Sequence, residues 1–98
     1  MFEIRTTAVF DAWIDALRDQ KAVERIARRI LRFRAGLLGD VKPVGDGVME
    51  MRVDHGPGYR VYYIRSGSQV IILLCGGDKR NQERDIAAAK RLANEERR

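Results

Sequence analysis

Four basic side chains lie at or near the ends of three successive strand-like segments in this sequence of 98 residues. They are Arg52, Arg60, Lys79 and Arg80. Cations on neighbouring strands can converge on one face of a sheet, and converging cations can bind phosphate. Strand alternation places Glu50 on the same face as Arg52, and Tyr62 on the same face as Arg60. We therefore predict one cavity that gathers up to four cations, a phenol and a carboxylate.

Two helices precede these strands. Alternation at residues 2–5 indicates a short first strand, after which Thr6 or Thr7 can cap a helix that runs to about Arg18. Asp19 can cap a second helix that runs to about Ala35, where Gly36 stops it. Because the join is short, we expect the two helices to form an antiparallel hairpin. Residues 36–47 contain four glycines and a proline and are predicted to form a surface loop.

Three strands and a last helix follow. Residues 49–53 alternate between apolar and polar side chains, the HGPG turn at residues 55–58 joins them to a strand over 60–63, and residues 70–74 are apolar on both faces, as in a central strand. Asn81 can cap a helix whose inward side chains end at Ala93, with a frayed tail beyond Asn94. The predicted order is β-α-α-β-β-β-α, an α+β fold in one domain, residues 1–98.

The composition narrows the class of protein. Nineteen basic against fourteen acidic residues give a net charge of +5, which favours a polyanionic partner, although a cationic surface can also serve only solubility. The lone Cys75 lies in an apolar segment and is predicted to be buried in a reducing compartment. There is no membrane-spanning run and no signal-peptide core, so we expect a cytoplasmic protein without membrane contact. No cluster of residues has metal-ligand spacing, so we expect no metal and no cofactor.

Three segments carry a resemblance to a known family. GDVKPVGDGVMEMR, GPGYRVYY and LLCGGDKRNQERDI stand in the order and at the spacing found in toxins of the RelE/ParE superfamily. The sequence most resembles the Gp49-like, HigB-related branch of addiction-module killer proteins. The resemblance covers most of the chain and implies a curved antiparallel sheet with the helices on one side and a polar concave face on the other.

The resemblance also implies a function. It suggests the toxin of a type II toxin–antitoxin pair, acting as a ribosome-dependent, metal-independent mRNA endoribonuclease that inhibits translation. The expected partners are a cognate helix-turn-helix antitoxin, mRNA on the ribosome, and operator DNA only through the antitoxin. Two alternatives stay open, because some ParE relatives inhibit DNA gyrase by binding, and a non-toxic member could act only as a co-repressor with its antitoxin.

Cleavage of RNA without metal needs a base for the 2′-hydroxyl, neutralisation of the phosphorane and an acid for the leaving 5′-oxygen. Arg60 matches the arginine that RNA-cleaving relatives place at the scissile phosphate. Arg52, Lys79 and Arg80 follow as phosphate clamps, and Tyr62 is expected to join them in binding RNA. RelE has lysines and a helical tyrosine for proton transfer, whereas the nearest positions here hold Glu50, Met49 and about Asp85. Glu50 and His55 are thus the candidate bases.

Each of these residues also has an ordinary structural interpretation. Glu50 and Arg52 could form a plain strand ion pair, Tyr62 could simply pack on the sheet, and His55 could be a solvated turn residue. The arginine-rich second helix could be a solvated face or a surface toward the ribosome or antitoxin. Only the placement of the side chains in space can decide among these interpretations.

Overall fold

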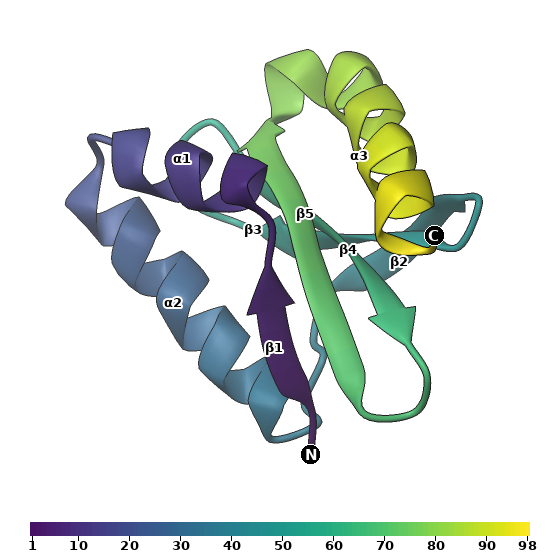
Figure 1. Ribbon diagram of the computed structural model, residues 1–98. Helices are drawn as coiled ribbons and strands as arrows, with labels where there is room; N and C mark the ends of the chain where they lie inside the picture. The colour runs from purple at the N-terminus through teal and green to yellow at the C-terminus, as the bar shows by residue number, and fades with distance from the viewer.

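A five-stranded sheet carries three helices in the computed structural model, which describes residues 1–98 (Figure 1). The α+β fold predicted from the sequence is confirmed. In chain order the elements are β1 (Glu3–Thr6), α1 (Ala8–Ala16), α2 (Gln20–Arg34), β2 (Val41–Gly45), β3 (Val48–Val53), β4 (Tyr59–Ser66), β5 (Val70–Asp78), a 3-10 turn (Lys79–Asn81) and α3 (Gln82–Glu96).

The strands lie in the order β1-β5-β4-β3-β2. Strands β3 to β5 form an antiparallel meander, as expected. Strand β2 adds to it beside β3, and β1 joins the other edge of the sheet parallel to β5. Because β1 flanks β5, the apolar segment at residues 70–74 is an interior strand, which agrees with its apolar character on both faces. Figure 1 shows β1 beside β5, with α1 and α2 opening at an angle from their short join.

Polar caps start the first two helices where the sequence predicts them. The Thr7 hydroxyl accepts a hydrogen bond from the Phe10 backbone N–H at 3.1 Å, and an Asp19 carboxylate oxygen accepts from the N–H groups of Lys21 and Ala22. Helix α2 ends at Arg34, and Gly36 follows with a φ of 88° that favours glycine.

Two helix ends differ from the prediction. Asn81 makes no side-chain cap, and Asp78 instead caps the 3-10 turn by accepting from the Arg80 N–H at 2.9 Å. The tail beyond Asn94 does not fray at once, because α3 continues to Glu96. The Arg97 guanidinium then donates to the Asp46 carbonyl at 2.9 Å, which holds this end against the sheet.

The predicted loop at residues 36–47 is wrong in part, because it contains β2. This strand pairs with β3 from Val41 opposite Met51 to Gly45 opposite Val48. Pro43 lacks an N–H donor, but an edge strand tolerates this loss. Asp46 and Gly47 both have positive φ, 56° and 77°, the pattern of a tight type I′ hairpin turn.

The expectation that all helices lie on one side of the sheet is also wrong. Helices α1 and α2 cover one face, where Phe10, Ile26 and Phe33 pack on side chains of β3, β4 and β5. Helix α3 covers the opposite face, where Ala89 and Ala93 pack on a second cluster (Figure 1). Opposite Tyr62 and Tyr63, a β-bulge in β5 leaves Leu74 without a partner on β4, so the consecutive residues Leu74 and Cys75 both belong to this second cluster. The polar face that the sequence predicts is therefore partly covered by α3.

Cys75 is buried, as predicted, and burial raises the pKa of its thiol to about 12. None of the three helices combines the length and the apolar character that crossing a bilayer requires.

Gly76 of β5 allows a test of the packing between α1 and the sheet. A methyl group added there would overlap the Trp13 ring of α1. We predict that Gly76→Ala lowers the free energy of unfolding by about 1–3 kcal/mol through overpacking, measured by urea denaturation. In a Trp13→Leu background the same substitution should cost clearly less, because the obstructing ring is gone. Ser68→Ala in the exposed β4–β5 turn is the control, and equal losses for both alanine variants would contradict the assignment.

Candidate phosphate-binding site

An open hollow of about 410 Å³ lies where β3, β4 and the end of β5 meet. Three of its lining side chains are cations, two are carboxylates, and none is aromatic. The lining residues are Asp40, Arg52, Asp54, Gly56, Pro57, Gly58, Arg60 and Lys79. We call this site the basic hollow.

The strand register brings the three cations together. Arg52 of β3 lies directly opposite Arg60 of β4, and Arg60 lies opposite Gly77 of β5, two residues before Lys79. Like charges directly opposite each other on neighbouring strands repel, so this arrangement costs free energy unless anions lie nearby. Arg52, Arg60 and Lys79 therefore converge as the sequence suggested. Their mutual repulsion favours the binding of an anion at this place.

Arg60 is held from below by a buried carboxylate. Glu50 is fully buried, and its Oε1 lies 3.7 Å from Arg60 Nε, while its Oε2 accepts a hydrogen bond from Gln82 Nε2 at 3.0 Å. The Arg60 side chain is 11% exposed and also donates to the Tyr59 carbonyl at 3.3 Å. Glu50 thus supplies a counter-charge that orients the guanidinium, while Arg60 keeps an opening onto the hollow.

Glu50 and Tyr62 do not line the hollow, although strand alternation suggested that they would. The start of α3 lies over both, and Gln82 reaches from α3 to Glu50. Tyr62 is completely buried and its hydroxyl has no hydrogen-bond partner. Burial, followed by the nearby Glu50 carboxylate, raises the pKa of the Tyr62 phenol well above its usual range. Neither group can touch a ligand in this arrangement.

Arg80 and His55 also lie outside the hollow. The Arg80 side chain is 78% exposed and pairs with Asp78 at 2.9 Å, which raises the pKa of Arg80 and lowers that of Asp78. His55 Nε2 lies 3.1 Å from Asp19 Oδ2 at the start of α2. The pKa of Asp19 is lowered first by the Ala22 N–H and then by His55. The turn that carries His55 therefore directs it toward α2.

Two carboxylates in the hollow were missed by the sequence analysis. Asp40 pairs with Arg52 at 3.1 Å, and it reaches that position only because β2 lies beside β3. Asp54 follows the end of β3 and makes no hydrogen bond or ion pair through its side chain. A signal for Asp54 existed, because it lies two residues after Arg52 in a continuing alternation. For Asp40 there was no comparable local signal.

Arg29 of α2 supports the wall of the hollow. Its guanidinium donates to the backbone carbonyls of Arg52 and Leu38, the second at 3.1 Å. Burial lowers the pKa of Arg29, and Asp40 opposes that shift. Arg29 therefore ties α2 to β3 and to the segment before β2.

The side chains that could bind a metal ion do not form a cluster. No group of three or more His, Cys, Asp or Glu residues is close enough to hold a metal ion.

Comparison with known proteins shows which sequences this chain resembles. Residues 12–97 match the family model described as "Phage derived protein Gp49-like (DUF891)". The chain is also similar to an "Uncharacterized protein" of Haemophilus influenzae, with 47% identity over 93 residues, which covers 95% of this chain and 94% of that relative.

The role of Glu50 as counter-charge can be tested by stability. Removing it leaves the Arg60 guanidinium buried without its anion, so we predict that Glu50→Ala lowers the free energy of unfolding by about 3 kcal/mol. Asp40→Ala breaks an ion pair that is largely exposed and should cost less than about 1 kcal/mol. Urea denaturation of both variants checks this difference. Similar losses in the two variants would mean that Glu50 does not hold a buried charge.

Proposed function

This chain belongs to the phage-derived Gp49-like family, part of the RelE/toxin-like addiction-module group, and from that premise we propose that it is a toxin that cleaves mRNA on the ribosome. Family membership implies pairing with an antitoxin. The observation that carries the nuclease proposal is the basic hollow, in which Arg52, Arg60 and Lys79 from separate segments face one open space.

The hollow is suited to the charge that develops during RNA cleavage. The 2′-oxygen attacks phosphorus, the bond from phosphorus to the 5′-oxygen breaks, and a cyclic phosphate and a 5′-hydroxyl result. The Arg60 and Arg52 guanidinium groups can neutralise the phosphorane through paired N–H groups. Lys79 carries an ammonium N–H that can protonate the leaving oxygen, and it is exposed at the rim.

Asp54 takes the role of base in this proposal. Glu50 is buried and His55 is turned toward α2, so neither candidate base from the sequence can reach a 2′-hydroxyl in the hollow. Asp54 lines the hollow, is exposed, and has no partner for its carboxylate. An ionised carboxylate can accept the 2′-hydroxyl proton from that place.

The hollow has no aromatic side chain on which a base could stack, and Pro57 is the one apolar ring in its lining. Base stacking is a main source of affinity for single-stranded RNA, so this protein alone should hold RNA weakly. Ribosomes present mRNA in a fixed conformation, which would supply the positioning that the hollow lacks. This is the physical reason for proposing a ribosome-dependent enzyme.

A second candidate function is inhibition of DNA gyrase by binding alone. The withdrawal of Glu50 and His55 from the hollow favours this alternative, because it leaves Asp54 as the only unpaired carboxylate there. The two candidates differ in their products, since a gyrase inhibitor would block supercoiling and leave mRNA intact.

For either function, we propose a helix-turn-helix antitoxin as the partner, with operator DNA bound only through it. Such an antitoxin would neutralise the toxin by covering or distorting the basic hollow. The pairing would be supported by a neighbouring reading frame that encodes a small acidic protein. That protein should co-purify with this chain.

We predict that tightly controlled expression of this protein arrests growth and produces mRNA breaks that primer extension detects. Arg60→Ala should reduce cleavage by about 10²–10³-fold, because it removes donors aimed at the phosphorane. Arg60→Lys keeps the positive charge and loses the fork, so it should recover only part of the activity. Arg98→Ala, at the exposed end of the chain, is the matched control and should leave the arrest unchanged.

Three results would overturn the nuclease proposal. Arrest that persists in the folded Arg60→Ala variant would remove its central residue. Arrest with intact mRNA and blocked supercoiling in a gyrase assay would establish the binding alternative. Expression without any effect on growth would favour a non-toxic co-repressor.

The role of Asp54 has a separate test. We predict that Asp54→Asn lowers ribosome-dependent cleavage of a reporter mRNA by about 10²-fold, as the loss of a general base typically does. Asp15→Asn on exposed α1 removes the same charge outside the hollow and should have no effect. Equal activity of the two variants would show that Asp54 does not accept the proton.

A further inference from the structure

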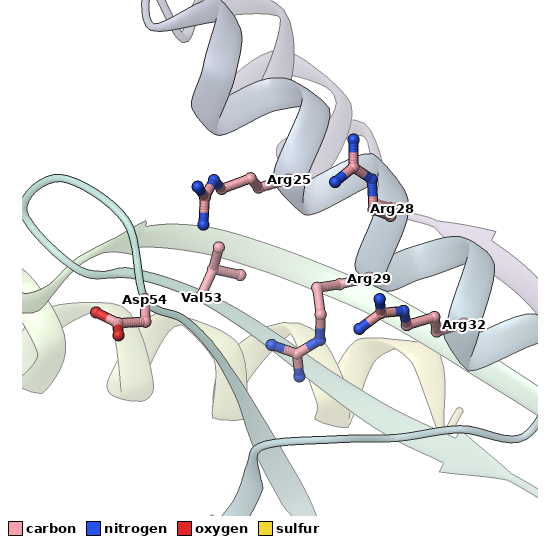
Figure 2. Close-up of a pocket in the computed structure, with 6 residues that line it drawn as sticks. All are labelled: Arg25, Arg28, Arg29, Arg32, Val53 and Asp54. Carbon is pink, nitrogen blue, oxygen red and sulfur yellow. The ribbon is translucent and has the colours of Figure 1, made fainter.

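A second basic pocket lies on α2, beside the basic hollow (Figure 2). It has a volume of about 250 Å³, and its lining residues are Arg25, Arg28, Arg29, Arg32, Val53 and Asp54. We propose that Arg25, Arg28 and Arg32, here called the α2 arginine face, bind backbone phosphates of the RNA strand outside the basic hollow. This inference rests on the proposed function and extends it to a second site.

The sequence of α2 creates this face. Residues 25, 28, 29 and 32 follow the i, i+3, i+4, i+7 spacing that places side chains on one side of a helix, while Ala22, Ile26 and Phe33 are buried against the sheet. Like charges at these spacings destabilise an isolated helix by a few tenths of a kcal/mol per pair, about as much as opposite charges stabilise it. Glu24, four residues before Arg28, is the single carboxylate of the helix, and no ion pair joins it to any of the four arginines.

Three of the four arginines have no partner. Arg25, Arg28 and Arg32 are exposed and make no side-chain hydrogen bond or ion pair. Arg29 differs, because its guanidinium is already bound to backbone carbonyls. Figure 2 shows Asp54 across the pocket with its carboxylate turned away from the arginines. The three free guanidinium groups are therefore available to an external anion.

The two basic sites are contiguous. Asp54 lines both, and Arg29 extends from the α2 side to the carbonyl of Arg52, which lines the hollow. A polyanion with one phosphate in the hollow can therefore place further phosphates against α2 without crossing an apolar surface. A chain of phosphates matches this arrangement better than a single small anion.

The lining also favours RNA over an acidic protein segment. Protein interfaces obtain most of their affinity from a few Trp, Tyr or Arg anchors that are buried in well-packed, desolvated pockets. The only apolar side chain here is Val53, which is 3% exposed and offers no surface for such an anchor. Guanidinium groups bind phosphate through two parallel N–H donors, so a phosphate backbone can use this site fully.

The test measures RNA binding rather than cleavage. The probe is a fluorescein-labelled 2′-O-methyl oligouridine of about 12 nucleotides, whose blocked 2′-oxygens cannot attack, and anisotropy is recorded over a range of salt concentrations. Each phosphate contact with a single strand contributes about 0.7 to the slope of log K against log salt. We predict that Arg25→Gln/Arg32→Gln reduces this slope by about 1.4. Arg91→Gln/Arg98→Gln removes the same charge from the α3 side and should leave the slope unchanged.

The outcomes separate this inference from the nuclease proposal. An unchanged slope in Arg25→Gln/Arg32→Gln overturns the inference, even if Arg60→Ala abolishes cleavage. An unchanged slope together with weaker binding of the purified antitoxin overturns it in favour of a protein partner. A reduced slope supports the RNA site, and it does so even if Arg60→Ala leaves mRNA cleavage intact and the nuclease proposal fails.

Discussion

The ion pair between Glu50 and Arg60 is the interaction on which the candidate site depends. Antiparallel pairing of β3 and β4 sets Arg60 directly opposite Arg52, and two facing cations need negative charge. Glu50 supplies it from beneath, with Oε1 3.7 Å from Arg60 Nε, and Asp40 supplies it at the surface beside Arg52. The Glu50–Arg60 pair is shielded from water, whereas the exposed Asp40–Arg52 pair can open when a phosphate arrives. This asymmetry makes Arg60 the fixed element of the hollow and Arg52 the adaptable one.

Helix α3 is what turns Glu50 into a positioning residue. By packing on the face of the sheet opposite α1 and α2, it buries Glu50 and Tyr62 and brings Gln82 to the free carboxylate oxygen. Glycines in β5 permit this packing from both sides. A side chain at Gly76 would meet Trp13 of α1, and one at Gly77 would meet Asp85 of α3. The end of β5 is thus clamped between two helices, and Lys79 leaves it at the rim of the hollow.

The arginines of this protein fall into two groups. Some are bound to other groups of the protein, and others have no partner within it. Arg29 is bound to backbone carbonyls and Arg80 to Asp78, so neither is available to a ligand without a cost. Arg25, Arg28 and Arg32 make no side-chain hydrogen bond or ion pair within the protein. Neither basic pocket has an aromatic side chain in its lining, so the cations there are suited mainly to phosphate contacts. Contacts to phosphate position a nucleic acid but carry no information about its base sequence.

Local sequence signals determined the elements and the three converging cations. Thr7, Asp19 and Gly36 mark helix ends through short-range hydrogen bonds and φ preference, and alternation put Arg52 and Arg60 on one face. The turn at Asp46 and Gly47 also has a local sequence signal. The residues before it alternate only weakly, so the sequence did not predict β2. Tertiary structure alone decided that α3 covers the second face, that Glu50 is buried, that His55 meets Asp19, and that Asp40 enters the hollow. Those outcomes depend on contacts between residues far apart in the chain, which no local spacing encodes.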